Sequence, residues 1–134
     1  MKRTALVIAS ERPTRRLLAS TLRPTRWWVG QASCVSEASL FISTIHLNLI
    51  LIDLAAQNWR DLPIFCSRAR QLVNPSTSRI ALLANGDDDC RITDEMRQAV
   101  DLILRKPFCR RVLVDWISET APSYRSVQFK RMSW

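Results

Sequence analysis

In the stretch Leu49-Ile50-Leu51-Ile52-Asp53, four apolar residues run directly into a single carboxylate. Short Ile/Leu runs are typical of strands buried on both faces, as in a parallel sheet covered by helices. A second mostly apolar stretch, from Val100 to Leu104, runs into Arg105-Lys106-Pro107. Open α/β sheets keep their sites at the carboxyl ends of the strands, so we expect these opposite charges to meet there.

Strand and helix signals alternate five times along the chain. The predicted strands cover residues 4–9, 27–33, 47–53, 79–84 and 100–104, and the predicted helices cover 13–22, 36–45, 62–73, 91–98 and 108–119. Apolar residues recur at helical spacing in the first of these helices, and Pro24 ends it. This order predicts an α/β domain with a doubly wound parallel sheet.

Some apolar side chains of these elements are expected in the core, and one acidic run is expected at the start of a helix. Leu17 and Leu40 fall on the apolar sides of the first two predicted helices, and Trp27-Trp28 at the entry to the second strand is expected in the core. The acidic run Asp87-Asp88-Asp89 is expected at the start of the fourth helix, because carboxylates stabilise a helix N-terminus.

Length and composition exclude several classes of protein. The 134 residues fit one domain, and 47% hydrophobic residues can bury a core. No apolar run approaches the roughly 18 residues of a membrane span, and Glu11-Arg12-Pro13 interrupts the N-terminal apolar run, so a cytoplasmic protein without a signal peptide is expected. The four cysteines are widely spaced and His46 is the one histidine, which argues against structural zinc and for free thiols in a reducing compartment.

The formal net charge of +8 is concentrated near both ends of the sequence. Residues 1–26 hold seven Lys/Arg and one acid, and residues 105–134 hold seven Lys/Arg and two acids. Such a balance predicts an acidic partner, either nucleic acid or an acidic protein surface. We place one domain at residues 1–120 and a basic C-terminal tail or linker stump at residues 121–134.

Four segments together carry a resemblance to a known family. These are residues 6–13, 49–54, 80–84 and 104–108, which read LVIASERP, LILIDL, IALLA and LRKPF. In this order and spacing the chain resembles, over about residues 4–120, the CheY-like receiver domain of bacterial response regulators. The resemblance implies a five-stranded parallel sheet with helices on both faces, the flavodoxin-like (βα)5 fold. It also implies a role in two-component signalling, with a kinase, phosphotransfer or output protein as partner.

The resemblance assigns roles to two charged residues. Asp53 matches the aspartate that accepts a phosphoryl group as an acyl phosphate, and Lys106 matches the lysine that pairs with the bound phosphate. The Lys106–Pro107 bond is typically cis in such domains. Asp53 is therefore either a phosphoacceptor or an inherited carboxylate that pairs with Lys106 and holds the edge of the sheet together.

The departures from the family pattern are as informative. Ser10 and Glu11 stand where the family has two Mg²⁺-binding acids, which leaves Glu11 and Asp53 as metal candidates and weakens the site. Glu11 is alternatively a solvated residue at a helix start. The family's strand-four hydroxyl falls on Leu83 and its switching aromatic on Ile103, and neither side chain can perform that task. Because Mg²⁺ neutralises charge during phosphoryl transfer, the resemblance implies a pseudo-receiver with a degenerate acceptor site.

The first and last helices of a receiver-like fold lie side by side. That arrangement would merge six arginines into one basic surface: Arg12, Arg15, Arg16, Arg23, Arg110 and Arg111. The surface either docks a partner or only keeps the protein soluble. DNA is the less favoured partner, since no helix-turn-helix pattern follows residue 120 and aromatics are not interleaved with the arginines.

The function expected from the sequence is signalling by protein docking, without enzymatic activity and without a requirement for phosphate. The alternatives are a genuine phosphoacceptor at Asp53 and a nucleic-acid-binding regulatory module that uses the arginine surface. No oligomeric state is predicted, and a dimer is one option.

Overall fold

The computed structural model describes residues 3–23, 27–74 and 77–118. The strands are β1 (Thr4–Ile8), β2 (Trp28–Ala32), β3 (Leu49–Asp53), β4 (Arg79–Ala84) and β5 (Leu102–Arg105). The helices are α1 (Arg12–Leu22), α2 (Val35–Thr44), α3 (Leu62–Leu72), α4 (Asp94–Ala99) and α5 (Arg110–Ser118), with a 3-10 turn η2 (Gly86–Asp88). The alternation predicted from the sequence is confirmed. The predicted tail, 121–134, lies outside the described residues.

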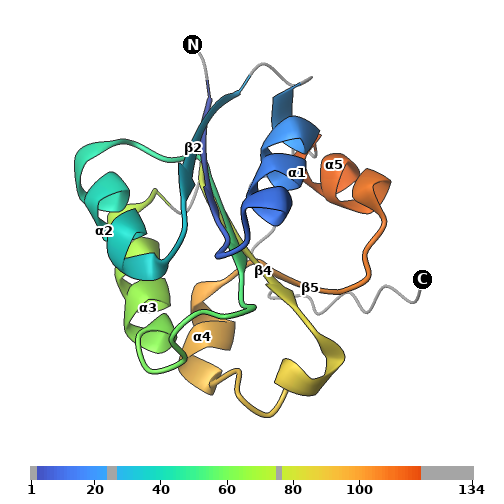
Figure 1. The fold of residues 1–134 in the computed structure, drawn as a ribbon. Helices are drawn as coiled ribbons and strands as arrows, with labels where there is room; N and C mark the ends of the chain where they lie inside the picture. Colours follow the sequence, from blue (N-terminus) through green and yellow to red (C-terminus); the bar gives the residue numbers. More distant parts are fainter. Residues whose placement is uncertain (1–2, 24–26, 75–76, 119–134) are drawn as a thin grey trace.

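All strand pairs in the sheet are parallel. The strand order is β2-β1-β3-β4-β5, with Ile8 opposite Ile52 and Asp53 opposite Leu83. Helices α1 and α5 cover one face of the sheet, and α2, α3 and α4 cover the other (Figure 1). The fold class predicted from the sequence is therefore confirmed: a doubly wound, flavodoxin-like sheet. None of the helices in the described ranges has the length and apolar character that crossing a bilayer requires.

The central strand β3 is buried along its whole length. Alternate side chains of a strand point to opposite faces, so Leu49 and Leu51 pack with the α1/α5 cluster, and Ile50 and Ile52 pack with the α2/α3/α4 cluster. Each such side chain stabilises the fold by about 1.5–3 kcal/mol on burial. The same alternation directs the side chain of Asp53 to the α1/α5 face.

Three apolar side chains expected in the core are exposed instead. Leu17 is 51% exposed, because the buried stripe of α1 runs through Leu18, Ala19, Thr21 and Leu22. Leu40 is 71% exposed, since α2 buries Val35, Ala38 and Ile42 on the side away from it. Trp28 is 44% exposed because β2 is an edge strand, whereas Trp27 is half-buried under the guanidinium of Arg3.

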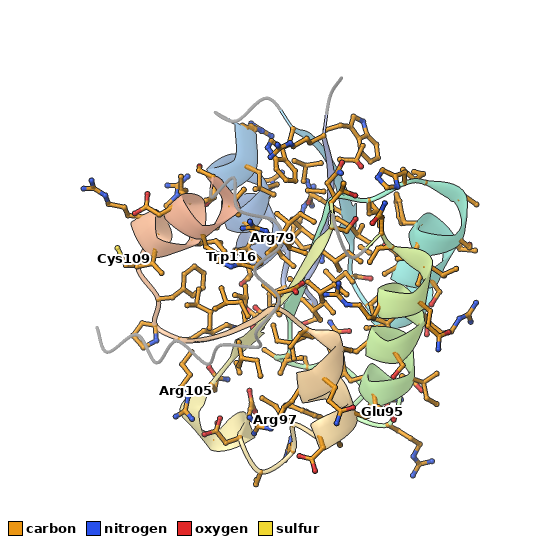
Figure 2. All side chains as sticks on the ribbon, turned by 180° about the vertical axis from the view of Figure 1, so that it is seen from behind. Arg79, Glu95, Arg97, Arg105, Cys109 and Trp116 are labelled. Carbon is orange, nitrogen blue, oxygen red and sulfur yellow. The ribbon has the colours of Figure 1, made fainter. Side chains whose placement is uncertain are left out.

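The acidic run Asp87–Asp89 does not stand at the start of α4, where the sequence placed it. It lies around η2, where Asn85 and Asp88 form a capping box and Asp89 pairs with Arg105. Helix α4 begins later, with Thr93 as N-cap and its own acids, Asp94 and Glu95, in the first turn. Figure 2 shows Arg105 beside the loop that holds η2. These acids therefore fix η2 in the β4–α4 loop rather than the start of α4.

Candidate functional site

Asp53 and Lys106 meet at the carboxyl edge of the sheet, as the sequence predicted. Asp53 is the last residue of β3 and is 3% exposed. The ammonium of Lys106, which follows β5, donates to Oδ1 at 2.6 Å and to Oδ2 at 2.7 Å. Charge-assisted hydrogen bonds of this kind are short and strong. The Lys106–Pro107 bond is cis, as the resemblance implies.

Leu83 lies directly beside this ion pair. Strand β4 separates β3 from β5, and its residue opposite Asp53 is Leu83, which is fully buried. Its side chain belongs to the same core cluster as Leu51 and Leu104. The pair is therefore bordered by a side chain that offers no hydrogen-bond donor or acceptor. Ile103 packs into the cluster on the opposite face of the sheet.

The β1–α1 loop is joined to Asp53 through Ala55. The hydroxyl of Ser10 donates to the carbonyl of Ala55 at 3.1 Å, and the amide of Ala55 donates to Oδ1 of Asp53 at 3.0 Å. Glu11 is exposed at the N-cap of α1, and its side chain makes no capping hydrogen bond. The two positions that the resemblance aligned with metal-binding acids thus hold a hydroxyl turned to the backbone and a solvent-exposed carboxylate.

This edge of the sheet does not suit Mg²⁺. A hard dication requires several oxygen ligands in near-octahedral geometry. Both oxygens of Asp53 accept hydrogen bonds from Lys106, and the Ser10 hydroxyl is committed to Ala55. Within the described ranges, no cluster of three or more His, Cys, Asp or Glu side chains could hold a metal ion. The side-chain oxygens of Asp53 and Ser10 are therefore engaged within the protein, which leaves the exposed Glu11 at the predicted metal positions.

One arginine predicted for the basic surface is not exposed on it. Arg12, Arg16 and Arg23 are exposed and line one shallow hollow along α1, with Ser20 between them. Arg15 instead turns inward: its Nη1 donates to the carbonyls of Ala9 at 2.8 Å and Ser10 at 3.1 Å. It does not belong to the exposed surface.

Helix α5 adds Arg110 to this surface. Arg110 is exposed, and its guanidinium reaches α1, with Nε donating to the hydroxyl of Thr21 at 2.9 Å and Nη2 to that of Ser20 at 3.3 Å. Arg111 is also exposed. The expectation that the first and last helices lie side by side is confirmed (Figure 1). The arginine face is hereafter Arg12, Arg16, Arg23 and Arg110.

An apolar groove of about 470 Å³, which the sequence did not predict, borders the arginine face. It runs between α1 and the segment that enters α5, and it is lined chiefly by Leu17, Leu18, Pro107 and Phe108. Leu17, the half-exposed leucine, also lines the basic hollow, so the two depressions share one wall. Lys106, which is paired with Asp53, and Arg110 also line the groove.

Gln57 is a structural residue of the site that the sequence did not single out. It is 5% exposed, and its side-chain amide donates to the carbonyl of Ser33 at 3.0 Å and accepts from the amide of Val35 at 3.2 Å. These bonds tie the loop after Asp53 to the start of α2. A lone glutamine in a loop carries no periodic signal, which is why only the structure reveals it.

A second unpredicted contact fixes the far end of α5. The guanidinium of Arg79 donates to the carbonyl of Trp116 at 2.5 Å and lies 5.3 Å from the centre of its ring (Figure 2). A cation at a helix C-terminus satisfies carbonyls that lack intrahelical partners. Arg79 therefore anchors α5 to the start of β4.

The chain is similar in structure to solved response regulators and receiver domains. A two-component response regulator from Clostridium difficile matches with a TM-score of 0.73 and 18% identity over 87% of this chain and 93% of its own. A CheY-like receiver domain protein from Methanospirillum hungatei matches at 0.72 and 16%, over 92% and 97%. The receiver domain of NtrX from Brucella abortus matches at 0.68 and 17%, over 89% and 98%.

The chain therefore has the fold of a CheY-like response regulator receiver domain. No protein-family model matches the sequence. No curated protein matches it either.

Proposed function

We propose that this protein is a receiver-like module of two-component-type signalling that docks onto a protein partner and does not need phosphate on Asp53. It would work in the cytoplasm without enzymatic activity, with residues 1–120 as the receiver-like domain and 121–134 as a tail or linker stump. The observation that carries the proposal is the closed ion pair between Lys106 and both oxygens of Asp53.

The surroundings of Asp53 support a role that is independent of phosphorylation. Phosphoryl transfer is achieved almost entirely by positioning the groups and neutralising the charge on the transferred oxygens. Here Leu83 offers no hydroxyl to such oxygens, and Glu11 is exposed to solvent. Ile103, which has no ring to reorient, is packed into the opposite face. The carboxylate is best explained as one half of a structural pair that joins β3 to β5.

The arginine face and the neighbouring groove support docking. Protein interfaces combine an apolar centre with a polar rim, and arginine is enriched in them. The groove with Leu17 and Phe108 would supply the centre, and Arg12, Arg16 and Arg23 would supply a rim that attracts carboxylates. A kinase, phosphotransfer protein or output protein with an acidic docking surface is therefore the expected partner.

A complementation experiment tests the proposal. A strain that lacks the gene receives the wild type, Asp53→Asn, or the triple variant Arg12→Glu/Arg16→Glu/Arg23→Glu, and the signalling phenotype is scored. We expect Asp53→Asn to restore signalling and the triple variant to fail. Loss of signalling in a folded Asp53→Asn variant supports the phosphoacceptor alternative and refutes the proposal.

The nucleic-acid alternative has its own signature. If the arginine face binds DNA or RNA, the affinity falls steeply with salt, because each neutralised phosphate releases counterions. A fluorescence anisotropy titration with a mixed-sequence duplex at two salt concentrations measures this dependence. The docking proposal predicts no binding of the duplex at physiological salt.

A further inference from the structure

Arg15 occupies a different environment from the other arginines of α1. It is half-buried, and its Nη1 donates to two successive backbone carbonyls, Ala9 at 2.8 Å and Ser10 at 3.1 Å. Helical side chains point back toward the N-terminus, so a long side chain in the first turn can reach the residues that precede the helix. The positive charge of Arg15 is thereby placed at the carboxyl end of β1.

This end of β1 is connected to the Asp53 pocket by hydrogen bonds. Ser10, whose carbonyl accepts from Arg15, uses its hydroxyl to hold the carbonyl of Ala55 at 3.1 Å. The amide of Ala55 in turn donates to Asp53 at 3.0 Å. The hydrogen-bond network at this edge thus contains two cations, Arg15 and Lys106, and one carboxylate, Asp53.

The oxygens that Arg15 holds are of the kind that bind divalent cations. Backbone carbonyls and carboxylates are the ligands of Mg²⁺ and related hard ions. A guanidinium bound to these oxygens repels a dication that approaches the same edge. Ser10 also lacks the carboxylate that would compensate for this repulsion.

We propose that Arg15 is a built-in cation, a positioning residue that takes the place of a divalent metal at the carboxyl end of β1 and keeps the Asp53 pocket independent of metal. The inference deepens the proposed function, on which it rests, since a pocket that carries its own cation can stay closed without metal or phosphate. It also predicts that two changes together, removal of the guanidinium and addition of a carboxylate at position 10, convert the pocket into a cation site.

Mn²⁺ provides the test, because it is paramagnetic and broadens amide resonances close to it. The full chain, labelled with ¹⁵N, is titrated as wild type, as Ser10→Asp, and as Ser10→Asp/Arg15→Ala. We expect no local broadening at Ala55 and Leu83 in the wild type. The double variant should show it, with an affinity about tenfold or more above that of Ser10→Asp, which corresponds to about 1.4 kcal/mol.

A matched variant shows whether the gain in Mn²⁺ affinity depends on the position of the removed arginine or only on the net charge. Ser10→Asp/Arg16→Ala removes a neighbouring arginine of α1 that lines the exposed hollow, and it should bind Mn²⁺ no better than Ser10→Asp. If the Arg15→Ala chain does not fold, Ser10→Asp/Arg15→Gln replaces it, since glutamine keeps a donor but loses the charge.

Two outcomes overturn the inference: equal Mn²⁺ affinity of Ser10→Asp with and without Arg15, or local broadening in the wild type. Neither phosphate nor a partner takes part in this titration. Its failure therefore leaves the docking proposal standing, and failure of the complementation experiment leaves the cation result standing.

Discussion

Lys106 holds both carboxylate oxygens of Asp53 although 53 positions separate the two residues in the chain. The contact exists because β3 and β5 run parallel on either side of β4, so their carboxyl ends meet at one edge. Leu83, a fully buried apolar residue, lies on β4 opposite Asp53 and so borders the ion pair. The edge at which receiver-like folds keep their chemistry is here occupied by an internal ion pair.

The two halves of this pair should contribute unequally to stability. Lys106→Met leaves a 3% exposed carboxylate without its cation, which costs about 3 kcal/mol in the free energy of unfolding. Asp53→Asn keeps an acceptor beside a lysine that is 25% exposed, so its cost is about 1 kcal/mol. Urea unfolding of both variants measures the difference, and a larger loss in Asp53→Asn contradicts the structural role of the pair.

Charge reversal on the arginine face should abolish docking without unfolding the domain. Arg12→Glu/Arg16→Glu/Arg23→Glu is expected to weaken partner binding about a hundredfold or more, because close interfacial charge pairs contribute about 1.5 kcal/mol or more each. A photo-crosslinking residue in place of Ser20, which lines the hollow, identifies the partner, and fluorescence anisotropy gives its affinity.

The control for this prediction reverses two arginines elsewhere. Arg60 and Arg68 are exposed, and Arg68 lies on α3, across the sheet from α1. Arg60→Glu/Arg68→Glu lowers the net charge by 4, against 6 for the triple reversal, and should bind as the wild type does. Equal weakening by both sets of reversals means that the arginine face only supplies net charge.

Gln57→Ala should destabilise the domain more than an ordinary surface change. The substitution leaves the amide of Val35 and the carbonyl of Ser33 without their side-chain partner, at a cost of about 1–3 kcal/mol. Gln98→Ala on α4, which removes an exposed glutamine, should change stability by less than about 0.5 kcal/mol. Thermal unfolding monitored by circular dichroism compares the two variants. Equal unfolding midpoints would show that the hydrogen bonds of Gln57 do not stabilise the domain.

The four thiols should differ in reactivity. Cys34, Cys90 and Cys109 are exposed, while burial, followed by the charge of Glu95, raises the pKa of Cys66 from 9.0 to about 12. Thiolate is the reactive form, so a thiol-specific chromogenic reagent at pH 8 should modify Cys66 last in the native protein. Rapid modification of Cys66 together with the others contradicts its burial.

The same thiol makes stability depend on alkaline pH. Between pH 9.0 and about 12 the unfolded chain loses a proton from Cys66 that the folded chain keeps. Its contribution to stability is therefore full below pH 9.0 and decreases as the pH rises through this range. In Cys66→Ala this part of the slope should disappear, which urea titrations between pH 8 and 10 can measure.

Much of the fold could be predicted because hydrophobic periodicity specifies it. The run from Leu49 to Ile52 is apolar on both faces, and a strand buried in this way requires helices on both sides of the sheet. The exposure of side chains at the border of the core could not be predicted so well. Leu17 lies one residue outside the buried stripe of α1, and Trp28 is exposed because β2 is at the edge of the sheet, which the local sequence does not reveal.

The candidate site, too, could be predicted only in part from the sequence. Asp53 and Lys106 could be paired from the sequence because each follows a predicted parallel strand, and the ends of such strands meet. The inward turn of Arg15 could not be predicted, since helical spacing alone groups it with its exposed neighbours, Arg12 and Arg16. The role of Gln57 could not be predicted because its partners, Ser33 and Val35, lie more than 20 residues away, before and at the start of α2.

Beryllofluoride, a mimic of aspartyl phosphate, tests whether the Asp53 pocket is closed to phosphoryl chemistry. Amide NMR spectra of the ¹⁵N-labelled chain are recorded with Mg²⁺ before and after its addition, with Asp53→Asn as the control. If the pocket is closed, no shifts at Asp53, Leu83 or Lys106 depend on beryllofluoride. Shifts at these residues that vanish in Asp53→Asn would contradict a closed pocket and identify a working phosphoacceptor.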